Sequence, residues 1–100
     1  MNNKILKTLS TSNRIALPKK LLELSGLDYN QEVAVCTAHK GIKLASLSNL
    51  NNVKVIDVVK IDEKGRIVIP CFLLEEDHHE NEILSVYCLN GCIYIESIED

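Results

Sequence analysis

Residues 58–75, VVKIDEKGRIVIPCFLLE, repeat the pattern of residues 6–23, LKTLSTSNRIALPKKLLE, at an offset of 52 positions. Further along the chain the two halves still match, at an offset of 51 positions. A fixed spacing shared by so many positions indicates an internal tandem repeat. The aligned positions are Arg14-Ile15 with Arg66-Ile67, Leu17-Pro18 with Ile69-Pro70, 21–23 with 73–75, Val33 and Val35 with Leu84 and Val86, and Ile42 and Leu44 with Ile93 and Ile95.

Each repeat begins with an extended segment that leads into a polar turn, at 10–13 in the first copy and 62–65 in the second. Asn13 and Gly65 occupy matching positions in these turns. Both residue types tolerate a positive φ, so we expect a tight hairpin in each copy. Apolar residues at even spacings mark the strands. The expected strands are 5–9 and 53–61, which return as 15–17 and 67–69.

A short helix follows the second strand of each copy. Pro18 and Pro70 suit the first helical turn, where the missing N–H has no partner to lose. Gly26 is the expected C-cap of the first helix. The acidic run at 75–80 opposes the helix dipole, so the second helix should be short or frayed. The apolar face expected for the first helix consists of Leu17, Leu21 and Leu24.

Each repeat ends in a hairpin, and the Asn90-Gly91 turn is a strong hairpin signal. The strands expected around the two turns are 33–37 with 42–47 and 83–89 with 92–97. A unit of roughly 45 residues is too small to bury its own core well, so two units must share one. The sequence therefore predicts a mainly β fold with short helices, built from a first repeat at 1–47, a linker at 48–52 and a second repeat at 53–100.

Composition excludes several classes of protein. The chain has 100 residues, of which 46% are apolar and 25% charged, a balance typical of globular domains. It contains neither a run of about 20 apolar residues nor the apolar segment of a signal peptide, so we expect a cytoplasmic protein without a membrane partner. Reduced thiols are then expected at Cys36, Cys71, Cys88 and Cys92.

The stretch 59–70, VKIDEKGRIVIP, resembles the signature of the SpoVT/AbrB swapped-hairpin family. The resemblance extends over 4–47 and 53–97, and two copies in one chain resemble the arrangement of MraZ proteins. It implies a swapped-hairpin β-barrel made of two fused repeats, and DNA binding by transcription regulators or antitoxins. The Asp-x-x-x-Arg pattern of MraZ repeats is kept at Asp62–Arg66, but Ser10 replaces the aspartate in the first copy.

Charge divides unevenly between the halves. Residues 1–50 carry a formal charge of +4 and residues 51–100 a charge of -7. We therefore expect the first repeat to dock on duplex DNA, even though the overall pI of about 5.6 is low for such proteins. Lysines neutralise phosphates, whereas an arginine fork can also bind a guanine edge. The candidate DNA-binding residues are Lys4, Lys7, Arg14, Lys19 and Lys20, helped by Lys64 and Arg66.

Among these residues, Arg14 is the expected contact to a base edge. Arg66 has an alternative role, a salt bridge to Asp62 or Glu63 across the turn. Helix positions 19 and 20 hold lysines, but the matching positions of the second copy hold Cys71 and Phe72. We therefore expect a homodimer in which the first repeats of two chains contact DNA together.

The sequence also bears on three other functions, which are metal binding, enzymatic activity and protein binding. A metal site is conceivable at His78-His79 with Cys88 and Cys92, but cysteines in alternating strands more often serve as small core residues. Neither a phosphate-binding glycine loop nor a metalloprotease motif is present, and we expect no enzymatic activity and no cofactor. The alternative function is a protein-binding module or antitoxin, whose acidic second repeat, chiefly 75–82, contacts a basic partner.

Overall fold

The computed structural model describes residues 4–10, 13–49, 54–69 and 83–98, and within them the chain is mainly β. The helix and the linker expected after Pro70 and at 50–53 lie outside the described residues. The elements in chain order are β1 (Ile5–Thr8), β2 (Arg14–Ala16), α1 (Lys19–Ser25), β3 (Glu32–Ala38), β4 (Gly41–Ser46), the 3-10 helix η1 (Leu47–Asn49), β5 (Val55–Lys60), β6 (Arg66–Val68), β7 (Ile83–Leu89) and β8 (Cys92–Ser97).

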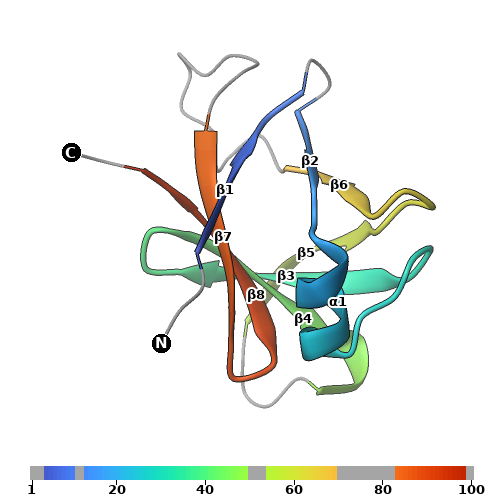
Figure 1. The fold of residues 1–100 in the computed structure, drawn as a ribbon. Coiled ribbons are helices and arrows are strands. Elements are labelled where there is room, and N and C mark those ends of the chain that lie inside the picture. The colour runs from blue at the N-terminus through green and yellow to red at the C-terminus, as the bar shows by residue number, and fades with distance from the viewer. Residues whose placement is uncertain (1–3, 11–12, 50–53, 70–82, 99–100) are drawn as a thin grey trace.

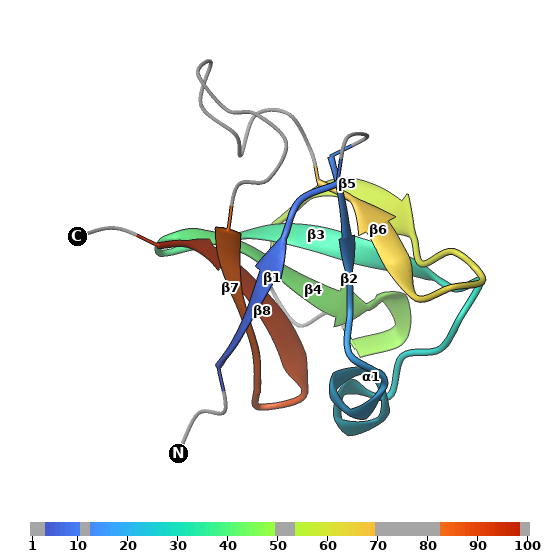
Figure 2. The same cartoon turned by 45° about the horizontal axis from the view of Figure 1, so that its top comes forward.

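The two halves of the chain exchange their first strands. Six strands form one sheet in the order β1-β7-β8-β4-β3-β5, and β2 pairs with β6 in a separate two-stranded ribbon. Strand β1 of the first half therefore lies against the hairpin of the second half, and β5 of the second half lies against the hairpin of the first (Figures 1 and 2). The exchange takes place within one chain.

The strand registers reveal a local two-fold axis that relates the halves. The pair Ile42–Ile95 has its counterpart in Leu44–Ile93, and Lys43 pairs with its own equivalent, Tyr94. In the ribbon, Ile15 likewise pairs with its equivalent, Ile67. The axis passes between β4 and β8 and between β2 and β6, so the ribbon is centred on it. The offsets of 52 and 51 read from the sequence match these registers.

One hydrophobic core serves both halves. The side chains of Ile15 and Ile67 point from the ribbon into this core and are at most 1% exposed. Strands from both hairpins supply the rest, including Val33, Ile42 and Ile93. This shared core agrees with the expectation that neither repeat buries enough apolar surface alone.

Helix α1 has the ends that the sequence predicts but not the predicted face. Pro18 is the N-cap residue, and Gly26 is the C-cap with a φ of 70°. Leu24, however, is 59% exposed, whereas Leu22 is buried beside Leu21. The helix is only 7 residues long, so its packing against β7 and β8, and not a long apolar stripe, determines which of its side chains are buried.

Most strand boundaries differ from expectation by one or two residues, and the pairing of the first strands differs as well. Both ribbon strands begin and end one residue earlier than predicted. The turns at Asn13 and Gly65 do have positive φ angles of 58° and 80°, but β1 pairs with β7 and not with β2. The predicted tight turns are present, because Ser10 and Asp62 each donate their N–H to the carbonyl of the arginine four positions later at 2.9 Å. The strands on either side of each turn do not pair with each other in the described residues, because β2 and β6 pair together in the ribbon. The six-stranded sheet is not closed into a barrel in the described part of the chain.

Candidate nucleic-acid interface

The outer face of the β2–β6 ribbon carries two arginines. Opposite residues of an antiparallel pair share a face, and the registers place Arg14 opposite Val68 and Arg66 opposite Ala16. Because Ile15 and Ile67 are buried, these four residues form the outer face. The two arginines are diagonal neighbours across the strand pair, and strand geometry places the Cα atoms of such neighbours about 7–8 Å apart. The local two-fold axis runs between them.

Arg66 is held by the turn that precedes it. Its Nε donates to Oδ2 of Asp62 at 2.9 Å, so the ion pair that the sequence offered as the alternative role of Arg66 is present. Oδ1 of Asp62 accepts the backbone N–H groups of Arg66 and Lys64, each at 2.8 Å. The backbone N–H of Arg66, followed by that of Lys64 and by the Arg66 guanidinium, holds the pKa of Asp62 below its ordinary value.

Arg14 has different surroundings. Its side chain is exposed, and the described residues give its guanidinium no ion pair. Ser10 takes the place of the aspartate, and its Oγ accepts the backbone N–H of Arg14 at 3.3 Å. The backbone of this turn is nevertheless held in the same way as the other one, because Ser10 N–H donates to the Arg14 carbonyl at 2.9 Å.

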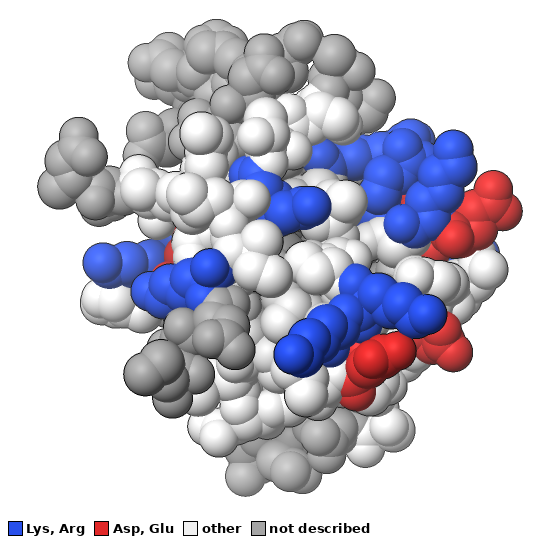
Figure 3. All heavy atoms as spheres, in the orientation of Figure 1, with Lys and Arg blue, Asp and Glu red and all other residues white. Residues whose placement is uncertain are grey.

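Four of the predicted lysines lie on elements next to the ribbon. Lys64 is exposed in the turn before β6, and Lys19 and Lys20 are exposed at the start of α1, which directly follows β2. Lys7 is half-buried on the core-facing side of β1. In Figure 3, basic side chains lie over the ribbon side of the molecule and over α1, with a further group at the left, and acidic side chains adjoin the basic groups at the upper right and below α1.

Lys4 is separated from this group. Its Nζ lies 5.1 Å from the ring centroid of Tyr87, on the opposite face of the sheet from Lys7. Tyr87 in turn stacks on Tyr94 and donates its hydroxyl proton to Glu96 at 2.8 Å. Burial, together with the Glu96 carboxylate, raises the pKa of Tyr87 to about 12. The structure therefore places Lys4 in an aromatic cluster on the outer face of the sheet.

The described residues are positively charged as a whole. All eleven lysines and arginines lie within them, but only seven of the fourteen acids do, which leaves a formal charge of +4. The other acids lie in 70–82 and 99–100. The low pI of the chain is thus due to the acids at 70–82 and 99–100, and not to the residues around the ribbon.

The cysteines do not converge on a site in the described residues. Cys36 is buried, and burial raises the pKa of its thiol. Cys88 and Cys92 are half-buried, and the Sγ of Cys88 lies 3.4 Å from the Oγ of Ser25. Within the same part of the chain, no group of three or more His, Cys, Asp or Glu side chains is placed to hold a metal ion. His78 and His79 lie outside it.

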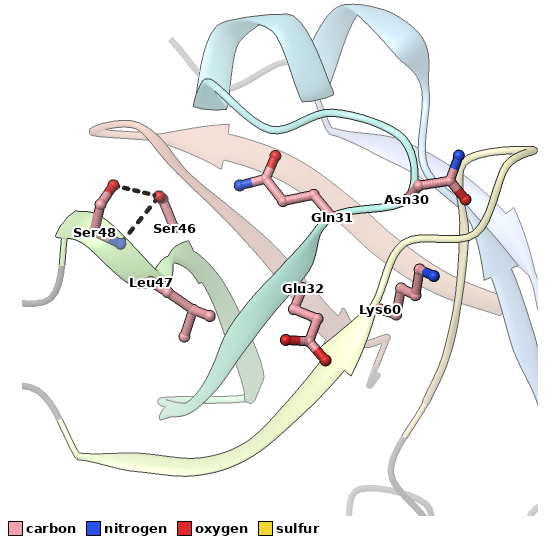
Figure 4. Close-up of a pocket in the computed structure, with 7 residues that line it drawn as sticks. All are labelled: Asn30, Gln31, Glu32, Ser46, Leu47, Ser48 and Lys60. Atoms are coloured by element: carbon pink, nitrogen blue, oxygen red, sulfur yellow. Dashed lines mark hydrogen bonds between the residues drawn. The ribbon is translucent and has the colours of Figure 1, made fainter.

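A groove of about 540 Å³ lies where β3, β4 and β5 meet η1 (Figure 4). Glu32 and Lys60 occupy paired positions of strands β3 and β5, and the Oγ atoms of Ser46 and Ser48 are 2.9 Å apart. One acid and one base leave the groove without a net charge. It therefore lacks the positive surplus that phosphate binding requires.

Sequence reasoning did not name Asp62 as a site residue. The structure shows that Asp62 fixes both the turn and the Arg66 side chain. The sequence did contain a signal for this role of Asp62. An acid that stands four residues before an arginine across a turn can contact both the backbone N–H and the guanidinium of that arginine.

Comparisons with known protein families, with curated proteins and with solved structures found no match for this chain. The resemblance to the SpoVT/AbrB family thus rests on the sequence motif. No helix among the described residues is long and apolar enough to cross a membrane.

Proposed function

We propose that this protein binds duplex DNA as a transcription regulator and docks through the outer face of the β2–β6 ribbon. The observation that carries the proposal is the pair of arginines, Arg14 and Arg66, set diagonally about a local two-fold axis. The major groove admits a two-stranded β-ribbon, and the DNA backbone has two-fold symmetry of its own. A ribbon with one arginine on each side of its axis matches both features.

The elements around the ribbon supply the electrostatic part of the contact. Lys64, Lys19 and Lys20 are exposed on the turn and helix that adjoin the ribbon strands. Each lysine that neutralises a phosphate releases counterions and adds to the salt dependence of binding. Lys7 flanks the ribbon on β1, whereas Lys4 contributes through the overall field only, because it contacts Tyr87.

The strand exchange supports the wider assignment to a tandem swapped-hairpin unit of the SpoVT/AbrB type. Each repeat, 1–47 and 53–100, gives its first strand to the hairpin of the other. A closed barrel, a cytoplasmic location and a homodimer belong to the same proposal. One chain already presents two arginines, so a homodimer would extend the contact to a second ribbon.

A titration of labelled duplex DNA over a range of salt concentrations tests the proposal. We expect binding at low salt that weakens steeply with added salt, with a log–log slope near about -0.9 for each phosphate contact. Replacing Arg14 or Arg66 by alanine, or Lys19 and Lys20 together, should weaken binding. Lys40→Ala is the matched control, because Lys40 is exposed in the turn between β3 and β4 and lies on a groove with Lys4, away from the ribbon.

Two results would overturn the proposal. Absence of binding at low salt would remove it, and the acidic stretch 75–82 would then be tested for a basic protein partner. Equal losses for Lys40→Ala and for the ribbon variants would show that net charge, and not the ribbon, determines binding.

A further inference from the structure

The two turns that lead into the ribbon share two backbone hydrogen bonds and differ in the side chain of their first residue. In each turn the first residue, Ser10 or Asp62, donates its N–H to the carbonyl of the arginine four positions later at 2.9 Å. In each turn it also accepts the N–H of Asn13 or Gly65 at 3.0 Å. The local two-fold symmetry therefore holds for these backbone bonds and is broken by the side chain of the first turn residue.

That side chain determines how firmly each arginine is held. The carboxylate of Asp62 has two oxygens, of which Oδ1 accepts backbone N–H groups while Oδ2 accepts the Nε of Arg66 at 2.9 Å. Ser10 has a single hydroxyl, and this hydroxyl contacts the backbone N–H of Arg14 at 3.3 Å. Among the described residues, only the second copy has a side-chain acceptor that is hydrogen-bonded to the guanidinium of its arginine.

The contact to Asp62 uses Nε, which is the donor nearest the side-chain stem. The two Nη groups at the end of the guanidinium have no hydrogen bond to any described residue. These two groups form the planar fork that matches the O6 and N7 acceptors of guanine. An arginine fixed at Nε has already lost much of its rotamer freedom, so less entropy is lost when its fork binds a base.

We infer that Arg66, positioned by Asp62, reads a guanine, whereas Arg14 contacts the backbone without selecting a base. This inference rests on the proposed function and goes beyond it, since it makes one chain a reader of an asymmetric site. One half of that site has a required guanine, and the two-fold related half does not. The sequence alone assigned the base contact to Arg14, so the two assignments can be tested against each other.

The test uses duplexes selected by the full-length protein from a pool of random sequences. Each selected guanine is then replaced in turn, and the loss of affinity is measured at fixed salt. We expect one guanine whose replacement weakens binding by about 5- to 100-fold, as for a bidentate arginine contact. Arg66→Ala should abolish this preference, whereas Arg14→Ala should weaken binding to all duplexes alike.

Two turn variants separate positioning from charge. Asp62→Asn keeps an oxygen for the backbone N–H groups but loses the acceptor for Nε, so the guanine preference should fall several-fold while the salt dependence stays unchanged. Ser10→Asp should create a second preferred guanine in the other half-site. Thermal melting of both variants checks that the protein as a whole is still folded.

The inference is overturned if Arg14→Ala removes the guanine preference, if Asp62→Asn leaves it intact, or if the wild type binds duplexes without preference. These results leave DNA binding itself standing. Failure of the wild type to bind any duplex at low salt overturns both the proposed function and this inference.

Discussion

Gly41 provides the sharpest structural prediction. It begins β4 and pairs with Glu96 of β8, in the ladder that joins the two hairpins. A Cβ at this position would overlap the carbonyl oxygen of Ile95 and lie 2.9 Å from the Cα of Glu96. Both atoms belong to the backbone, so no side-chain rotation relieves the collision. Gly41→Ala must therefore push β8 away from β4.

The expected cost combines two effects. Forcing extra volume into a packed site costs about 1–3 kcal/mol, and each weakened ladder hydrogen bond adds about 1 kcal/mol. We expect a loss of about 3 kcal/mol in the free energy of unfolding, measured by urea titration. In a domain of this size such a loss lowers Tm by about 12–24 °C.

Gly91→Ala is the matched control for Gly41→Ala. Gly91 has a φ of 80° and no neighbour within 4 Å of an added Cβ, so its substitution tests backbone strain without collision. Such strain costs about 1–2 kcal/mol. If Gly41→Ala costs no more than Gly91→Ala, the close approach of β4 and β8 described above is refuted.

Three further predictions concern the ribbon, its turn and the aromatic cluster. Ile67→Ala should lower the free energy of unfolding, measured by urea titration, by about 2–5 kcal/mol. Ile15→Ala should lower it by an amount within about 1 kcal/mol of that, because the local two-fold axis makes the two buried side chains equivalent. Clearly unequal losses would contradict that equivalence. The fold lowers the pKa of Asp62, so the charged carboxylate stabilises the protein at pH values above its ordinary pKa of 3.8. This stabilisation is lost as the pH falls through the lowered pKa. The Tm difference between wild type and Asp62→Asn should therefore vanish in acid. A difference that persists at low pH would show that the charged carboxylate of Asp62 does not stabilise the turn. Because the fold raises the pKa of Tyr87, the protonated hydroxyl stabilises the protein below pH 10, and this stabilisation is lost as the pH rises towards 12. Absorbance titration of wild type should show a phenolate step near 12 that is missing in Tyr87→Phe.

Local chemistry was readable from the sequence where a few neighbouring residues decide the conformation. Asn90 and Gly91 have φ angles of 54° and 80°, as their hairpin requires, and the strands on either side have the predicted bounds. Pro18 and Gly26 delimit α1 for similarly local reasons. In each case the signal lies within a few positions of the residue that responds to it.

The sequence failed where distant segments decide. Alternation along β1 predicts a strand but not its partner, and β7 is the partner only because the halves exchange strands. Leu24 has helical spacing from Leu21 and is still exposed, since tertiary packing rotates the short helix. In the candidate interface the residue types were foreseeable, including the Asp62–Arg66 pair, but the diagonal placement of Arg14 and Arg66 depends on a pairing between the two repeats.

The exchanged strands also set an order of events during synthesis. Ile5 finds its partner in Val86, so the first strand cannot dock until most of the chain has been made. At about 5–20 residues per second, the ribosome needs several seconds to supply that partner. Throughout this interval the open strand, with Leu6 among its side chains, has no hairpin to join. Until then, a nascent first repeat can complete its sheet only with the hairpin of another copy of the repeat, supplied by a neighbouring chain.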